Sequence, residues 1–155
     1  MEDPILSFEG EYFFLSNFYP SLIVIKGTTF PALEHAYQAM KSTDASEQQK
    51  IARASTPGRA KRMGRQIVQL RPEWESIKIE VMTRLVRIKF SVPELRQKLL
   101  ATGEARLEEG NRHYDTWWGI HPIGSGKGRN ELGRILMQIR NEIRYNCDEN
   151  NPEEL

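Results

Sequence analysis

The sequence predicts an α+β domain that is rich in helix and has a small β-sheet. Strand-length apolar segments stand early in the chain, helical periodicity dominates the middle, and one further strand is expected late, before a closing helix. Strands and helices segregated in this way are typical of the α+β class. The chain has 155 residues, which favours a single domain. A domain of this size buries about 70% of the surface of its unfolded chain, so it needs no disulfide to fold.

Composition indicates a soluble globular protein of a reducing compartment. Hydrophobic residues make up 39% and charged residues 28% of the chain, and the formal net charge is +1. So small a net charge does not predict tight, non-specific binding to nucleic acid. The one cysteine, Cys147, excludes an intrachain disulfide. Residues 1–11 predict neither a signal peptide nor a membrane span, so we expect a cytoplasmic location and no membrane association.

The first third of the chain predicts a β-hairpin followed by a helix. Leu22–Lys26 is a short apolar run that ends at Gly27, and Thr28–Phe30 follows. After Pro31, apolar residues recur at helical spacing over Leu33–Ser42.

Capping residues predict the helices in the middle of the chain. Asp44 suits the N-cap of a helix over 45–54. Thr56 before Pro57 predicts a second helix over 58–64.

The second half predicts three more helices. The longest is expected over 72–90, with an apolar stripe made of Trp74, Ile77, Val81, Leu85 and Ile88. Pro93 opens another helix that ends near Gly103. Residues 105–128 predict a strand and then a loop, and a helix over 130–145 follows. The acidic residues 147–155 are expected to form a loose tail, which places the domain at 1–146.

Three polar residues of the first predicted helix share one face. Glu34, Gln38 and Lys41 stand at i, i+4 and i+7. A solvated ladder of side chains is the more common reason for such a pattern. The alternative is a cleft that holds a carboxylate, an amide and an amine, in which burial would lower the pKa of the amine and make it a nucleophile.

Three other stretches allow a binding function or an ordinary structural one. Residues 13–20 place four aromatic residues around Ser16 and Asn17, which suits either a core segment or a wall for a flat ring. Trp117 and Trp118 stand together in a predicted loop between carboxylates, where they pack on the core or stack on a base. Residues 124–130 are rich in glycine and basic residues before a helix, which suits either a phosphate site or a flexible loop.

Motifs of several common sites are missing. The glycine-rich loop lacks the spacing of a Walker A or a Rossmann fingerprint, and there is no Gly-x-Ser-x-Gly elbow. The three histidines, His35, His113 and His121, have no zinc-ligand spacing. We therefore expect no metal and no cofactor.

Taken in order, several short motifs resemble the YbiA/NADAR family. The matching pieces are Phe14–Phe18, Phe30–Lys41, Thr56–Lys61, Lys89-Phe90, Leu99–Gly103, Asp115-x-x-Trp118-Gly119 and Gly128-x-Asn130-x-Leu132-Gly133. The ordered set covers nearly the whole chain, from Phe8 to Arg144. The resemblance implies a YbiA-like domain at 1–146 and a hydrolase of N-glycosidic bonds. Its implied substrates are phosphoribosylamino-pyrimidine intermediates of riboflavin synthesis or ADP-ribose attached to guanine.

The resemblance also implies roles for individual residues. Lys41 would capture the sugar as a Schiff base, and Glu34 would transfer protons. Asp115 or Glu109 would orient ribose hydroxyls or activate water. The implied substrate-binding residues are Phe14, Ser16, Asn17, His35, Gln38, Trp118, Gly119 and Asn130, with Phe14 and Trp118 stacking on a base and Asn130 holding ribose or phosphate with the glycine-rich loop. The run from Glu108 to Asp115 is about one residue longer than the family pattern, which leaves the choice between Glu108 and Glu109 open.

Two other classes of function compete with the enzyme. A non-catalytic module would bind ADP-ribose or a related nucleotide in the same place, and a structural adaptor would need a large exposed apolar patch. The basic residues between Arg53 and Arg65 suit either a polyanion or a solvated face. The expected partner is a small nucleotide-like substrate or ADP-ribosylated nucleic acid, with no obligate protein partner.

Overall fold

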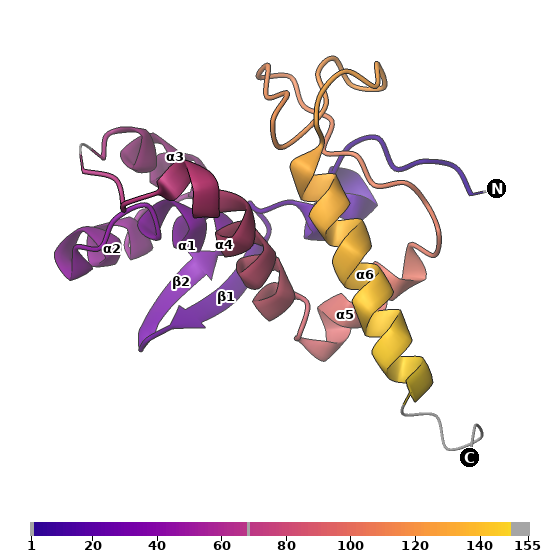
Figure 1. Ribbon diagram of the computed structural model, residues 1–155, viewed down its shortest axis with the longest axis horizontal. Coiled ribbons are helices and arrows are strands. Elements are labelled where there is room, and N and C mark those ends of the chain that lie inside the picture. The colour runs from indigo at the N-terminus through magenta and orange to yellow at the C-terminus, as the bar shows by residue number, and fades with distance from the viewer. Residues whose placement is uncertain (1, 68, 150–155) are drawn as a thin grey trace. The chain divides into compact units, whose positions relative to one another are not determined.

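The computed structural model describes residues 2–67 and 69–149, which form two compact units. Unit 1 comprises Met1–Ser16 and Phe90–Leu155, and unit 2 comprises Asn17–Lys89. The described elements are helices and one antiparallel pair of strands (Figure 1). The predicted α+β class, helix-rich with a small sheet, is therefore confirmed.

Unit 2 begins with the predicted hairpin. Strands β1 (Pro20–Ile25) and β2 (Thr28–Ala32) pair in antiparallel register, with Ile23 opposite Phe30. Lys26 and Gly27 form the two-residue turn and have φ of 47° and 82°. Positive φ at both positions gives the turn whose twist matches the flanking strands, which explains the glycine. Ile23 and Phe30 are buried, so this cross-strand pair anchors the sheet on the core.

Helix α1 (Leu33–Ala39) lies at the centre of unit 2 (Figure 1). It contacts both strands and each of the other three helices of the unit. All seven of its residues are buried. A helix that is covered on every side can hold polar residues only if they find partners.

Helices α2 (Ala45–Ala52) and α3 (Pro57–Arg65) begin at the predicted caps. The carboxylate of Asp44 accepts the backbone N–H groups of Ser46 and Glu47. The hydroxyl of Thr56 accepts the N–H of Arg59 at 3.1 Å. Each side chain satisfies donors that have no partner inside the helix, which confirms both predictions.

The predicted face of helix α4 (Trp74–Lys89) is only partly right. Ile88 is 40% exposed, whereas the buried residues are Trp74, Met82, Leu85, Val86 and Lys89. Apolar residues occupy more than one side of this helix, so periodicity alone did not select the side that packs on α1 and β1. The buried Lys89 could not be anticipated from an apolar pattern.

Unit 1 contains the 3₁₀ helix η1 (Gly10–Leu15), α5 (Pro93–Ala101) and α6 (Glu131–Glu149), and α5 packs on α6. Helix α6 has 19 residues and α4 has 16, so the prediction that 72–90 forms the longest helix is wrong. Helix α6 also extends past 145 into the predicted tail, of which 150–155 lie outside the described residues.

The late strand expected within 105–128 is absent from the described structure. Only two isolated bridges occur there, Ile5 with Leu107 and Gly110 with Ile120. Side-chain hydrogen bonds to backbone groups, described below, hold this segment in place of a strand ladder. No helix in the described ranges is long and apolar enough to cross a membrane.

Candidate active site

The polar residues of α1 lie inside unit 2. Glu34 is 6% exposed and Gln38 is 3% exposed. The more common interpretation of this pattern, a solvated ladder, is therefore wrong for these two side chains. Gln38 Nε2 donates a hydrogen bond of 2.8 Å to Glu34 Oε1. The carboxylate of Glu34 is thus buried and held by an amide one helical turn away.

Gly64 of α3 explains how the amide of Gln38 is held. A Cβ atom on Gly64 would overlap with the side-chain oxygen of Gln38, so α3 presses its backbone directly on this amide. Rotation of the amide by 180° would turn its oxygen toward the carboxylate of Glu34, which is repulsive. Gly64 and Glu34 together therefore fix the orientation of Gln38.

Lys41 follows α1 and is half-buried. Its Nζ lies 5.7 Å from the ring centroid of Tyr37. Burial lowers the pKa of Lys41, Glu34 opposes this change, and the positive charges of Arg65 and Lys61 lower the pKa further. A lysine with a lowered pKa has a larger neutral fraction near pH 7, and only the neutral amine is nucleophilic.

Arg71 fixes the backbone around Lys41, and the sequence pattern did not single it out. Its Nε donates to the carbonyl oxygen of Met40 at 3.0 Å, and its Nη2 donates to that of Ser42 at 3.3 Å. Its own backbone N–H donates to the carbonyl oxygen of Lys41 at 2.6 Å. One residue thus binds three consecutive carbonyl groups where α1 ends, a place that favours a cation.

Two other predicted residues of unit 2 have internal partners. A ring nitrogen of His35, Nε2, lies 3.0 Å from the carbonyl oxygen of Ala54, and the side chain is 1% exposed. The backbone oxygen of Asn17 accepts the N–H of Glu34 at 3.0 Å. The side-chain Nδ2 of Asn17 lies 3.6 Å from the sulfur of Met82. These contacts place the start of α1 and tie it to its neighbours.

In unit 1, Asn111 organises the segment that contains Asp115. Its Nδ2 donates to the carbonyl oxygen of Asp115 at 2.8 Å, and its Oδ1 accepts the N–H groups of His113 and Asp115 at 3.2 and 3.0 Å. Asp115 Oδ1 in turn accepts the N–H groups of Trp117 and Trp118 at 3.0 and 2.9 Å. Asn111 was not predicted as a site residue, and its only signal is an asparagine in a loop, where such side chains bind nearby backbone.

The two adjacent carboxylates Glu108 and Glu109 make different contacts in the structure. Glu108 is buried and pairs with Arg106 at 2.7 Å. Glu109 Oε2 lies 3.3 Å from Nδ2 of Asn111. A Cβ atom on Gly119 would overlap with the carboxylate of Glu109, so Gly119 allows this approach. Glu109 is therefore the carboxylate that joins the Asp115 segment.

Asn130 and the start of α6 bind the protein itself. Asn130 Nδ2 donates to the carbonyl oxygen of Leu107 at 2.9 Å, and its Oδ1 accepts the N–H of Glu109 at 3.0 Å. The N–H groups of Asn130, Glu131 and Leu132 donate to the carbonyl oxygens of residues 119, 117 and 118. These contacts give no support to the expectation that Asn130 and the glycine-rich loop hold a phosphate.

The remaining predicted residues also lie in unit 1. Phe14 is 6% exposed and has Lys98 Nζ at 5.8 Å from its ring centroid. Ser16 ends η1, and its N–H donates to the carbonyl oxygen of Phe13 at 2.9 Å. Trp118 is half-buried and meets Trp117 edge to face, with ring centroids 6.5 Å apart. In the part of the chain that the structure describes, no group of three or more His, Cys, Asp or Glu residues could hold a metal ion.

These features define a small α+β protein in which a central helix carries a buried carboxylate and ends at an amine with a lowered pKa. The model of the NADAR domain matches residues 7–144, which includes residues of both units. The chain belongs to the NADAR family.

Known relatives agree with this assignment. The N-glycosidase YbiA of Escherichia coli is 41% identical over 148 residues, which cover 92% of this chain and 91% of the relative. A riboflavin biosynthesis protein of Vibrio vulnificus is 44% identical over 155 residues, but the chain spans only 41% of its length. The NMR structure of the Escherichia coli protein YbiA matches with a TM-score of 0.82 at 40% identity and covers 97% of this chain and 91% of that one.

Proposed function

We propose that this protein is an N-glycosidase that hydrolyses the bond between ribose and nitrogen in a nucleotide-like substrate. The observation that carries the proposal is the buried Glu34 carboxylate of α1 together with the amine of Lys41, which follows that helix and whose pKa is lowered by burial. Relatives named as N-glycosidases, which the chain matches over nine-tenths of their length, support the reaction class.

The proposed nucleophile is the neutral amine of Lys41. A proton placed on the ring oxygen opens the ribose and leaves an iminium at its first carbon. The amine of Lys41 adds to that carbon, and the substrate nitrogen takes a proton and departs. The carbon is then bonded to Nζ as a protonated Schiff base.

Water completes the reaction. It adds to the same carbon and replaces Lys41, which leaves as the ammonium, so the sugar is released as an aldehyde. The net change is one N-glycoside and one water converted to a free sugar and a free amine or base. Glu34 is the proposed proton donor and acceptor for these steps.

The proposed substrate carries a ribose phosphate. Two relatives are named as riboflavin biosynthesis proteins, which favours a phosphoribosylamino-pyrimidine. ADP-ribosyl-guanine is the second candidate, because it presents the same ribose–nitrogen bond. In unit 1, Asp115 and Glu109 stay proposed contacts of the ribose hydroxyls or of water, and Phe14 and Trp118 stay proposed contacts of the base.

The decisive test combines product analysis with chemical trapping. The protein is incubated separately with the two candidate substrates, and release of the base or amine is followed by mass spectrometry. Borohydride added during turnover should reduce the Schiff base and leave a sugar adduct on Lys41. Lys41→Ala should abolish the adduct and lower kcat by about a hundredfold or more, whereas Lys50→Ala, at an exposed lysine of α2, should change neither.

A non-catalytic nucleotide-binding module is the alternative. It predicts that both substrates bind without release of a base, and that Lys41→Ala alters affinity alone. Absence of release from both substrates, with binding intact, would reject the glycosidase.

A further inference from the structure

Three backbone donors at the start of α6 are already used within the protein. The N–H groups of Asn130, Glu131 and Leu132 are bound to carbonyl oxygens. In the loop before them, Arg129 pairs with Glu131 and stacks on Trp117, 3.9 Å from its ring centroid. The substrate class proposed above contains a phosphate, and cations elsewhere in the protein could neutralise its charge.

Helix α3 carries cations without a side-chain partner among residues 2–67 and 69–149. Arg59, Lys61, Arg62 and Arg65 make no ion pair and no side-chain hydrogen bond with any residue in the described ranges. In the same ranges, seven other cationic side chains have carboxylate partners, namely Lys78, Arg84, Arg106, Arg112, Arg129, Arg134 and Arg144. Cations that repel one another on a short helix lower the stability of the folded state, and they raise its affinity for an anionic ligand.

The packing of α3 divides these four cations into two pairs. Ala60 and Gly64 are buried, and Gly64 presses on Gln38 of α1. Because each helical residue advances by about 100°, Lys61 and Arg65 lie together on one side of this packed face. Met63 lies on the opposite side, where it lines a hollow of about 410 Å³ formed largely by α2.

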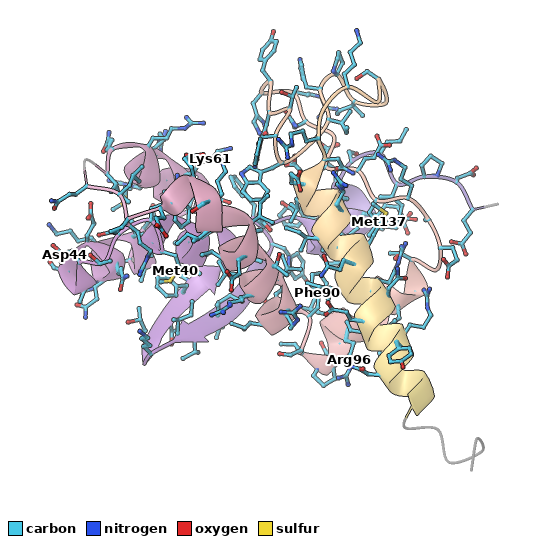
Figure 2. All side chains as sticks on the ribbon, in the orientation of Figure 1. Met40, Asp44, Lys61, Phe90, Arg96 and Met137 are labelled. Carbon is cyan, nitrogen blue, oxygen red and sulfur yellow. The ribbon has the colours of Figure 1, made fainter. Side chains whose placement is uncertain are left out.

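Arg59 and Arg62 occupy the rest of the helix surface. Arg62 lies opposite the packed face and Arg59 lies toward Met63. Lys61, which is labelled in Figure 2, is half-buried. The other three cations are exposed.

We propose that Lys61 and Arg65 form the subsite that binds a phosphate group of the substrate, beside the amine of Lys41. This inference rests on the proposed function for the identity of the ligand. A planar guanidinium with two parallel donors and a flexible ammonium on adjacent turns of one helix are a common means of binding phosphate.

The electrostatics of Lys41 support this placement. Arg65 and Lys61 are the cations whose charges lower the pKa of Lys41. A bound phosphate between these groups is attracted to all three cations. The same two residues would therefore keep the free amine partly neutral and direct the substrate toward it.

Two double variants test the subsite, and each removes two positive charges from α3. Lys61→Ala/Arg65→Ala deletes the proposed site, and Arg59→Ala/Arg62→Ala is the matched control. Binding of inorganic pyrophosphate and of orthophosphate is measured by calorimetry at fixed ionic strength. We expect the site variant to weaken the preferred anion by about tenfold or more and the control by less than about threefold. A preference for pyrophosphate would indicate a substrate that carries a pyrophosphate, and a preference for orthophosphate would indicate a phosphate monoester.

A second readout follows the pH profile of kcat/KM. Loss of two cations should raise the pKa of Lys41, so the acidic limb of the profile should move to higher pH in the site variant and stay in place in the control. Equal weakening of anion binding in both variants, or none in either, would overturn the subsite. Anion binding needs no turnover. If the protein binds anions as expected but releases no base, the glycosidase is rejected and the phosphate subsite still stands.

Discussion

The side-chain amide of Gln38 lies between the carboxylate of Glu34 on α1 and the backbone of α3. Gln38 donates to Glu34 at 2.8 Å and meets the backbone of Gly64 with its oxygen. The contact leaves no room for a side chain at 64. A glycine is therefore required there by close packing rather than by its backbone angles, since no positive φ occurs at this position.

Gly64→Ala should displace Gln38 and release Glu34. We expect a loss of about 1 to 3 kcal/mol in the free energy of unfolding, because overpacking forces a buried side chain out of place. The kcat of base release should fall as well. Gly58→Ala is the matched control on the same helix, since a Cβ there would meet only Thr56 Oγ1 at 4.0 Å. Chemical denaturation and single-substrate kinetics measure both effects.

The explanation is checked by a double-mutant cycle. Gln38→Ala removes the amide that the new methyl group would strike, so Gly64→Ala should cost less in that background. An unchanged cost would mean that Gly64 acts through something other than Gln38.

At the scale of elements, the end of α1 depends on a residue thirty positions away. Arg71→Lys retains the charge, but an ammonium cannot reach the carbonyl groups of Met40 and Ser42 in the way that the guanidinium does. We expect a loss of about 1 to 2 kcal/mol in the free energy of unfolding. We also expect kcat to fall by a larger factor than KM changes, because the amine of Lys41 would be less well positioned.

Arg53→Lys is the control for this variant, because Arg53 is an exposed arginine of the same unit. Denaturant titration and the yield of the borohydride adduct report stability and positioning separately. An Arg71→Lys protein with full adduct yield and unchanged kcat would show that Arg71 serves the fold alone.

The elements that were predicted correctly are those whose signals are local. Asp44, Thr56 and Pro57 act on the next three residues, and the hairpin turn needs only Lys26 and Gly27. Within 105–128 the loop was expected but the strand was wrong, because the shape of this segment depends on bonds to distant residues, such as Asn130 to Leu107. Asn111 and Arg71 were missed for the same reason: they bind mainly backbone N–H and carbonyl groups, which leave no pattern in the side-chain sequence.

For the molecule as a whole, the spacing of the polar residues of α1 could be predicted from the sequence, but their burial could not. The spacing of Glu34 and Gln38 follows from helical geometry, and it is their burial that excludes a solvated face. Burial itself arises because α1 is covered by both strands and three helices of unit 2. The sequence of α1 alone could not predict that the helix would be covered in this way. For that reason both interpretations, a solvated face and a buried polar site, stayed open.

Lys89 links the stability of the folded chain to pH. Its side chain is 1% exposed, its Nζ lies 5.6 Å from the ring centroid of Tyr19, and burial lowers its pKa to about 7. In the unfolded chain a lysine has a pKa of about 10.4. Between these values the unfolded chain holds a proton that the folded chain lacks, so this residue makes stability rise with pH by up to about 1.4 kcal/mol per unit. Below pH 7 the cost of burying the charge is fully present, and above pH 10 it has vanished.

Lys89→Met should therefore be more stable than the parent protein near pH 6 to 7, and the difference should shrink as the pH approaches 10. Denaturant titrations at one-unit intervals from pH 6 to pH 10 give the two stability curves. Lys50→Met, at an exposed lysine, should give a curve parallel to that of the parent. A constant difference between Lys89→Met and the parent would show that Lys89 keeps its proton in the folded state. The cation–π contact with Tyr19 would then be stabilising a buried charge rather than a neutral amine.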